Sequence, residues 1–252
     1  MLWRRNLLVL VLGLARPGSA APAAGAAPFP LRAAVPLLCT EMNMALRTRL
    51  RGTGLIADSA GTLLTAAHII VQAGSNCLLS VMIPDDEWAR AGHLRRFLLA
   101  GCRANLILDL AVCRVRPADD QRDWGYLRGA PIRFRPVVPG EGVWVTSFTG
   151  WALVPLTRSG RLTGRQDYRR QDGCLCDFAT DIAAVEGMSG SPVISNDGEV
   201  LGILTQAGRG KFHGTSFGVS LDEARTFLVN QGVQLPTPPH SVGLERRSSP
   251  SR

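Results

Sequence analysis

The stretch GTGLIADSAGTLLTAAH, residues 52–68, sets the pattern from which the fold can be predicted. Residues 52–58 form an apolar run typical of a β-strand, Ser-Ala-Gly follows as a turn, and residues 62–65 predict a second strand. The hairpin ends in Ala-Ala-His68. A lone histidine is usually incidental, but two alanines at a strand end leave room around the imidazole, which favours a functional His68.

The same pattern continues along most of the chain. From about residue 35 to residue 232, short apolar or alternating runs are broken by glycine and proline, which predicts an all-β barrel or sandwich. One helix is expected at about residues 221–230, with acids in its first turn and Gly232 as its stop. Further expected strands include residues 78–83, 110–115, 142–146, 191–194, 200–204 and 217–220.

The two ends of the chain differ from this central part. Residues 1–20 combine a basic start, a short apolar run and small residues, which is the pattern of a secretory signal peptide; an uncleaved anchor is the alternative. Residues 21–34 are expected to be a flexible lead-in, and residues 233–252 a disordered tail. We expect no stable membrane association once the signal is removed.

The composition is that of a globular protein, with 46% hydrophobic and 19% charged residues. The formal net charge is +8, but six of the arginines lie in the predicted leader and tail. The remaining basic residues are scattered among acids, with no basic stripe or aromatic platform. Nucleic-acid binding is therefore not expected.

The cysteines permit disulfides in an exported chain. Their spacing does not choose among the possible pairings, although Cys174 and Cys176 would share one face of a strand, which makes a bond between them unfavourable. Zinc ligation is the alternative, but no CxxC occurs and the histidines do not cluster beside cysteines, so we expect no metal and no cofactor. The six cysteines are Cys39, Cys77, Cys102, Cys113, Cys174 and Cys176.

A carboxylate and a serine complete a constellation with His68. Asp109 lies in an apolar run, where it is either a turn or capping residue or the acceptor of an imidazole N–H. Ser189 lies in Gly-Met-Ser-Gly, residues 187–190, which by itself could be an ordinary tight turn. The order His, Asp, Ser, each at the edge of a predicted strand, suits a base and an acid from one barrel and a nucleophile from the next.

These segments resemble the trypsin-like serine proteases, nearest to the bacterial HtrA/Deg and glutamyl endopeptidase branches. The resemblance covers about residues 50–232 and implies a chymotrypsin-like fold of two six-stranded β-barrels, split near residues 120–140, with a C-terminal helix. His68 matches the general base, Asp109 the orienting acid and Ser189 the nucleophile. The matching segments are GTGLIADSAGTLLTAAH, the DLAV of residues 109–112, and DIAAVEGMSGSPVISNDGEVLGI of residues 181–203.

The resemblance also implies the residues that surround the reacting bond. The backbone N–H groups of Gly187 and Ser189 are the expected oxyanion hole. Leu204, Phe217 and Gly218 are expected to border a substrate pocket, which predicts a small or apolar residue before the scissile bond.

The chain departs from the related branches at several positions. Met188 replaces the usual asparagine of HtrA proteins, and Leu204 replaces a histidine of glutamyl endopeptidases, so a preference for glutamate is not expected. His213 could enter the pocket but is expected to be solvated, and Asp181 is expected to be structural. Only about twenty residues follow the predicted helix, so no PDZ domain is expected.

The predicted function is an exported serine endopeptidase, periplasmic or secreted, that acts on protein or peptide substrates. One alternative is a binding or sensing protein on a protease scaffold, against which the intact triad argues. The other is an esterase with the same triad. The residue order and the lack of a strand–GxSxG–helix context argue against an α/β-hydrolase.

Overall fold

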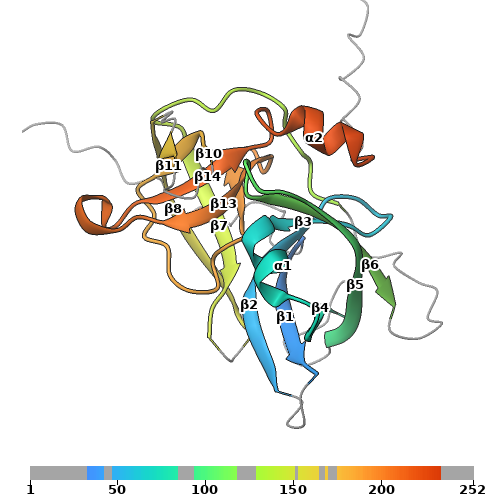
Figure 1. The fold of residues 1–252 in the computed structure, drawn as a ribbon. Helices are drawn as coiled ribbons and strands as arrows, with labels where there is room; N and C mark the ends of the chain where they lie inside the picture. Colours follow the sequence, from blue (N-terminus) through green and yellow to red (C-terminus); the bar gives the residue numbers. More distant parts are fainter. Residues whose placement is uncertain are drawn as a thin grey trace, which may run out of the picture.

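Two closed barrels of six β-strands each account for most of the described residues (Figure 1). The computed structural model describes residues 33–42, 47–84, 94–117, 129–150, 153–164, 168–169 and 175–233. The predicted all-β class, the double barrel and the helix after the last strand are confirmed. The predicted signal peptide, and nearly all of the predicted lead-in and tail, lie outside the described residues.

The first barrel has the strand order β1-β2-β3-β6-β5-β4, with every neighbouring pair antiparallel. A short helix, α1 (Ala67–Ala73), follows β3 directly. The strands are β1 (Ala34–Glu41), β2 (Thr48–Ile56), β3 (Thr62–Ala66), β4 (Cys77–Pro84), β5 (Leu94–Asn105) and β6 (Leu110–Pro117).

The second barrel has the order β11-β14-β13-β12-β7-β8. A two-stranded sheet of β9 (Tyr168–Arg169) and β10 (Leu175–Cys176), the 3-10 turn η2 (Gly210–Phe212) and the helix α2 (Arg225–Asn230) accompany it. The barrel strands are β7 (Gly142–Phe148), β8 (Pro155–Gly164), β11 (Phe178–Thr180), β12 (Pro192–Ser195), β13 (Val200–Ala207) and β14 (Ser216–Ser220).

Asp58 organises the turn between β2 and β3. Its Oδ1 accepts hydrogen bonds from the N–H groups of Ala60 (3.0 Å) and Thr62 (2.9 Å). Gly61 has a φ of 78°, which a residue without a Cβ adopts at little cost. This Asp-Ser-Ala-Gly turn closes the hairpin and directs β3 toward α1.

The described residues bury four hydrophobic clusters, of which the smallest comprises Cys176, Ala179 and Phe217. One lies inside the first barrel and another inside the second. A third joins Leu55, Leu64 and Leu110 of the first barrel to Ile194, Ile203 and Val219 of the second, with Leu228 of α2 packed onto it. The two barrels are therefore held together by a shared apolar core.

The structure corrects the boundaries of three predicted segments. The helix begins at Arg225 rather than Leu221, because the Leu221 N–H bonds to the Leu201 carbonyl oxygen (2.8 Å) and keeps that residue against β13. Ala34, assigned to the lead-in, is buried in β1, and Val233, assigned to the tail, is buried in the shared core. None of the described helices is long and apolar enough to cross a membrane.

Two disulfides lie in the first barrel. Cys39–Cys77 joins β1 to β4, and Cys102–Cys113 joins β5 to β6. Cys176 of β10 is buried against the second barrel, with its Sγ 3.6 Å from the hydroxyl of Thr205 in β13. Cys174 lies outside the described residues.

Candidate active site

The pairing of β3 with β6 brings His68 to Asp109. Ala66 lies opposite Leu110, so the residues that follow β3 meet the residues that precede β6. The His68 N–H donates to Asp109 Oδ1 (2.8 Å), and His68 Nδ1 lies 2.7 Å from Asp109 Oδ2. One carboxylate therefore holds both the backbone and the ring of the histidine.

The environment of this pair suits a base and its orienting acid. Asp109 is only 4% exposed, whereas the His68 side chain is 24% exposed. A hydrogen bond between buried groups is stronger than one in water. With Nδ1 donating to Asp109, Nε2 is the ring nitrogen left to accept a proton from a substrate-facing hydroxyl. Asp109 itself has a φ of 49°, in the left-handed region that Asp tolerates better than most residues.

The loop that carries Ser189 lies between the two barrels. The Ser189 carbonyl oxygen accepts a hydrogen bond from the N–H of Thr53 in β2 (2.8 Å). The next residue, Gly190, donates to the carbonyl oxygen of Leu204 in β13 (2.7 Å). Gly190 has a φ of 84°, and a Cβ there would lie 2.0 Å from the Thr53 carbonyl oxygen. Only glycine permits this approach.

Gly52 of β2 lies close to both the serine loop and the start of α1. A Cβ added to Gly52 would lie 2.7 Å from the Ser189 carbonyl oxygen and 2.4 Å from Cδ1 of Ile69, the residue after His68. The Ser189 hydroxyl makes no hydrogen bond with a described residue; such bonds often tighten only when substrate binds. The neighbouring Ser191 is fully buried, so Ser189 is the more accessible serine of the two.

Thr53 is a site residue that the sequence analysis missed. Its hydroxyl donates to the Gly187 carbonyl oxygen (3.0 Å) and accepts from the Phe148 N–H (2.9 Å). Its own carbonyl oxygen accepts from the Thr65 hydroxyl (2.8 Å), and its N–H holds Ser189. Thr53 thus fixes two peptide groups of the serine loop, but a threonine in an apolar strand carries no local signal of such a role.

The turn from Gly187 to Ser189 leaves two backbone donors unused. Within the described residues, neither the Gly187 N–H nor the Ser189 N–H donates a hydrogen bond. Gly187 has a φ of 93°, and Met188 is fully buried in the second barrel with its Sδ accepting from the Val185 N–H (3.3 Å). Two such donors in one turn, without an acceptor among the described residues, suit the binding of an oxyanion.

The residues expected to border a substrate pocket are buried in the second barrel. Leu204 packs in its interior beside Met188, and a Cβ at Gly218 would lie 2.5 Å from the Phe178 ring. Phe217 packs edge-on against Phe212, with ring centroids 5.6 Å apart. The pocket itself stays a prediction.

Asp181 is expected to be structural and His213 to be solvated. Asp181 Oδ1 accepts a hydrogen bond from the Arg161 N–H (2.6 Å), and His213 is exposed after η2.

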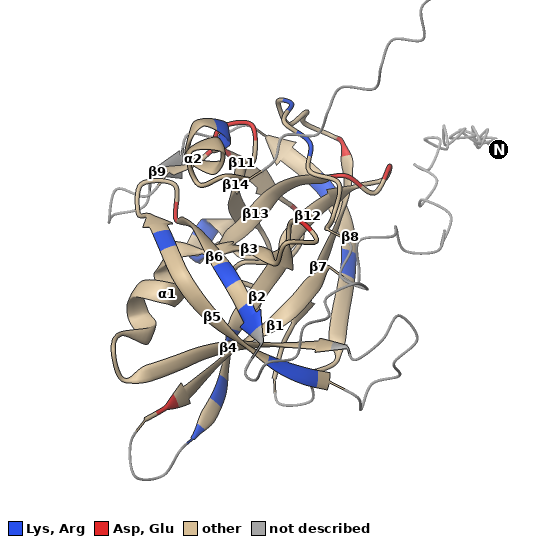
Figure 2. Ribbon diagram, turned by 90° about the vertical axis from the view of Figure 1, so that its right-hand side faces the viewer, with Lys and Arg blue, Asp and Glu red and all other residues tan. Residues whose placement is uncertain are grey.

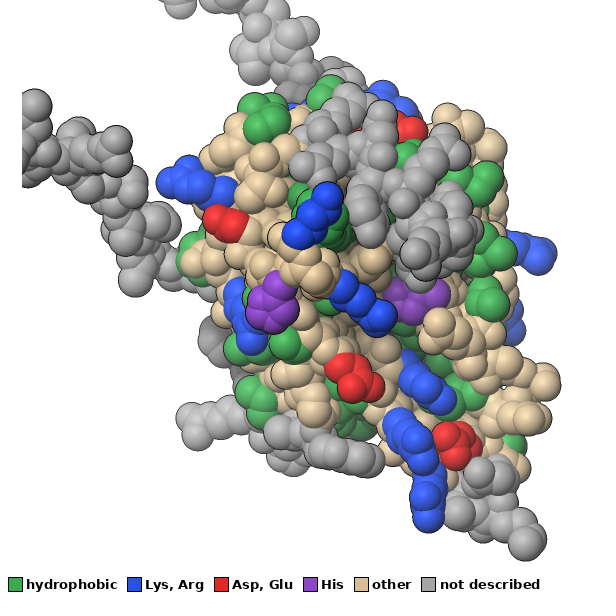
Figure 3. All heavy atoms as spheres, turned by 60° about the vertical axis from the view of Figure 1, so that its left-hand side comes forward, with side chains coloured by type: hydrophobic (Ala, Val, Ile, Leu, Met, Phe, Trp, Pro, Cys, Tyr) green, Lys and Arg blue, Asp and Glu red, His purple; other side chains and the backbone are tan. Residues whose placement is uncertain are grey.

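No group of three or more His, Cys, Asp or Glu in the described part of the chain could hold a metal ion. Figure 2 shows the described Lys and Arg residues spread over strands of both barrels, and Figure 3 shows His side chains on one face beside several of them.

Comparisons with known proteins identify the family and the fold. A family model described as a trypsin-like peptidase domain matches residues 52–203. The magnetosome formation protease MamE of Paramagnetospirillum magneticum strain AMB-1 is 26% identical over 195 residues, which are 74% of this chain and 24% of that protein. The chain thus spans about a quarter of the length of that relative.

A solved structure supports the fold. The crystal structure of the MamO protease domain from Magnetospirillum magneticum, in its apo form, superposes with a TM-score of 0.59 at 19% identity. The superposition covers 80% of this chain and 96% of that one.

Proposed function

Since the chain belongs to the trypsin-like peptidase family, we propose that it is a serine endopeptidase with Ser189 as nucleophile, His68 as general base and Asp109 as orienting acid. The observation that carries this proposal is the double contact between His68 and Asp109, through the backbone N–H at 2.8 Å and Nδ1 at 2.7 Å. A carboxylate engaged in this way holds one imidazole tautomer and one ring orientation, as a general base requires.

The proposed reaction follows from these positions. His68 Nε2 takes the proton of the Ser189 hydroxyl as its oxygen attacks the carbonyl carbon of the scissile peptide bond. The carbonyl electrons move to the oxygen, which the Gly187 and Ser189 N–H groups stabilise. Each such donor contributes about 3 kcal/mol to lowering the barrier. The peptide C–N bond then breaks, His68 protonates the leaving amine, and water hydrolyses the acyl-enzyme by the same steps.

We also propose that the protein is exported. Two disulfides are expected in an oxidising compartment and are rare in the bacterial cytosol. The signal-like pattern of residues 1–20 supports the same location. For the residue before the scissile bond we propose a small or apolar side chain, because the residues expected to border the pocket, Leu204, Phe217 and Gly218, carry no charged or polar side chain.

Labelling with a fluorophosphonate probe tests the proposed triad. Wild-type protein should react, whereas Ser189→Ala and His68→Ala should not, with circular dichroism showing that all three are folded. Ser59→Ala, in the β2–β3 turn, is the matched control and should label like wild type. If folded wild-type protein stays unlabelled, the endopeptidase proposal is wrong and a binding protein on a protease scaffold takes its place.

A further inference from the structure

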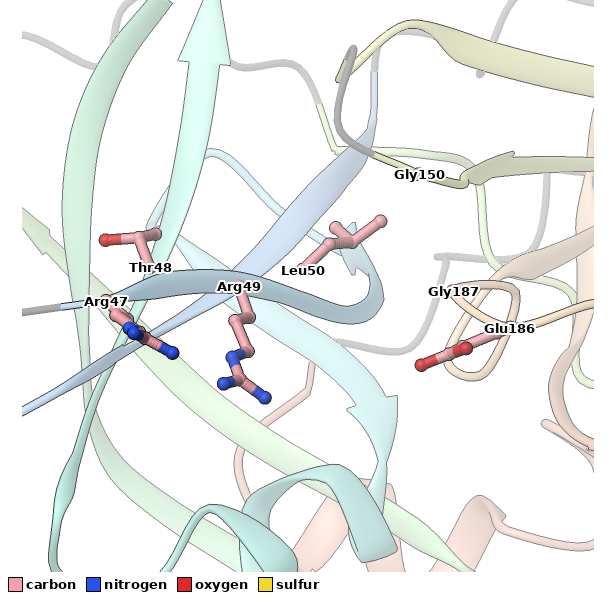
Figure 4. A pocket seen from close by; sticks show the side chains of 7 residues that line it. All are labelled: Arg47, Thr48, Arg49, Leu50, Gly150, Glu186 and Gly187. Atoms are coloured by element: carbon pink, nitrogen blue, oxygen red, sulfur yellow. The ribbon is translucent and has the colours of Figure 1, made fainter.

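An open pocket of about 700 Å³ lies directly beside Gly187. Residues 47–50 of the β2 end form one wall, and Gly150, Glu186 and Gly187 form the other (Figure 4). The pocket therefore begins at one of the two proposed oxyanion donors and extends away from it along the first barrel. Neither the triad nor the predicted pocket at Leu204 uses it.

Two arginines make the first-barrel wall basic. Arg47 and Arg49 are two residues apart, so they lie on the same side of the strand at a spacing of about 7 Å, and Figure 4 shows both side chains extending in one direction. Arg47 is exposed and makes no ion pair with a described residue. Arg49 is 49% exposed and has only a loose contact with Glu41, at 3.6 Å.

The opposite wall carries one acid. Glu186 is exposed and precedes Gly187, and in Figure 4 its carboxylate points toward Arg49 across the opening. No described ion pair joins Glu186 to either arginine. A second carboxylate would be repelled beside Gly187, but attracted at the β2 wall, where neither guanidinium group donates a hydrogen bond to a described residue.

The position of His68 indicates whether the part of a bound peptide before or after the scissile bond crosses this pocket. The serine loop lies between β2 and β13, held by Thr53 on one side and Leu204 on the other. His68, which must protonate the leaving amine, belongs to the first barrel, as does the β2 wall. The segment released with the amine therefore lies over the first barrel, along Arg47 and Arg49.

We propose that this pocket binds an acidic side chain of the substrate within the first few residues after the scissile bond, with Arg47 and Arg49 as the residues that recognise it. Glu186 keeps that acid away from the position next to Gly187. The inference rests on the proposed endopeptidase function and names its substrate class: peptides with Asp or Glu in the leaving segment.

Peptide cleavage tests the recognition. A peptide that the protein cleaves is first found in a digest mixture by mass spectrometry. It is then made with Glu, Gln or Lys at each of the first positions after the scissile bond, with an amidated C-terminus. At one position kcat/KM should be about fivefold higher for Glu than for Gln, and the ratio should shrink at high salt. The same peptides with a free C-terminus show whether the C-terminal carboxylate raises kcat/KM as much as a Glu side chain does.

Variants distinguish recognition by Arg47 and Arg49 from the effect of the protein's overall positive charge. Arg47→Gln/Arg49→Gln should bring the Glu-to-Gln ratio close to one. Arg103→Gln/Arg116→Gln removes the same charge from exposed positions on β5 and β6 outside the pocket and should keep the ratio. Glu186→Gln should shift the acidic preference nearer to the scissile bond. An unchanged ratio in the first variant, or a preference for Lys, overturns the inference.

A binding measurement distinguishes failure of the pocket from failure of the chemistry. If no peptide is cleaved, the endopeptidase proposal fails, and the pocket is tested on Ser189→Ala with fluorescein-labelled amidated peptides rich in Glu or Gln. Fluorescence anisotropy should show tighter binding of the Glu peptide, lost when Arg47 and Arg49 are both changed to Gln. Equal binding of the two peptides overturns the inference without reference to turnover.

Discussion

The two barrels contribute to the candidate site in different ways. In the first, the His68–Asp109 pair is formed within one barrel, by the register of two neighbouring strands, and that barrel also carries both disulfides of the described residues. In the second, the loop of Ser189 depends on a strand of the first barrel, because Thr53 of β2 donates hydrogen bonds to the carbonyl oxygens of Gly187 and Ser189. The base is thus placed locally and the nucleophile by the junction between the barrels.

This difference predicts that the pair and the loop can be damaged separately. A change at the junction should impair the nucleophile and leave the His68–Asp109 contact intact. A change within the first barrel's pair should leave the loop in place.

Asp109→Asn should have the largest effect. Asparagine keeps the shape but cannot stabilise the imidazolium, and its amide favours the wrong tautomer, so kcat should fall about 10⁴-fold. Steady-state peptide cleavage measures the loss. The downfield proton NMR signal of the His68 Nδ1 hydrogen bond should disappear. The barrel junction should persist, so the protein should still unfold cooperatively in urea. A variant with near wild-type kcat contradicts the role of Asp109.

Gly190→Ala should break the junction itself. The added Cβ would meet the Thr53 carbonyl oxygen at 2.0 Å and the Thr65 hydroxyl at 2.3 Å, and the φ of 84° is itself strained for alanine. The free energy of unfolding in urea should fall by about 4 kcal/mol. Gly74→Ala is the control, since its φ of 61° and ψ of −170° strain alanine but nothing lies within 4 Å, so only about 2 kcal/mol should be lost. Equal losses in both variants would show that the close approach at Gly190 does not contribute to the free energy of unfolding.

Thr53→Val should have a smaller effect, of about tenfold on kcat with KM little changed. Valine keeps the volume and removes the hydroxyl, so the Gly187 carbonyl oxygen and the Phe148 N–H lose a partner, at about 1–3 kcal/mol each. Thr53→Ser should restore kcat. The NMR signal of the His68–Asp109 hydrogen bond should persist in Thr53→Val, which a general loss of folding would not allow.

The control for Thr53→Val is Thr62→Val. Thr62 is equally buried in the same barrel, but its hydroxyl contacts Arg114 and not the serine loop. It should lose stability without losing kcat in the folded protein. A drop in kcat equal to that of Thr53→Val would argue against a specific positioning role for Thr53.

The amino-acid sequence predicts the structure correctly where the signal is local. The β2–β3 hairpin, the strand after Ser189 and the all-β class follow from apolar runs and turn residues that lie next to one another in the chain, whereas the double barrel is implied by the family resemblance. It was less accurate at the helix, whose predicted first turn is held against β13 by the Leu221–Leu201 hydrogen bond. It offered no sign of Thr53, because the partners of that hydroxyl are more than ninety residues away.

The sequence by itself determined the fold class, the family resemblance and the three candidate catalytic residues. Strand periodicity, turn residues and short motifs are each recognised from neighbouring residues, and the order of the motifs is read directly along the chain. Only the tertiary structure decided how the Asp109 carboxylate divides its oxygens between the ring and backbone of His68, and which disulfides form. It alone brought Arg49 and Glu186 to opposite walls of one pocket. Such contacts join residues from different strands and barrels, and barrel closure, which depends on the register and packing of the whole chain, sets their distances.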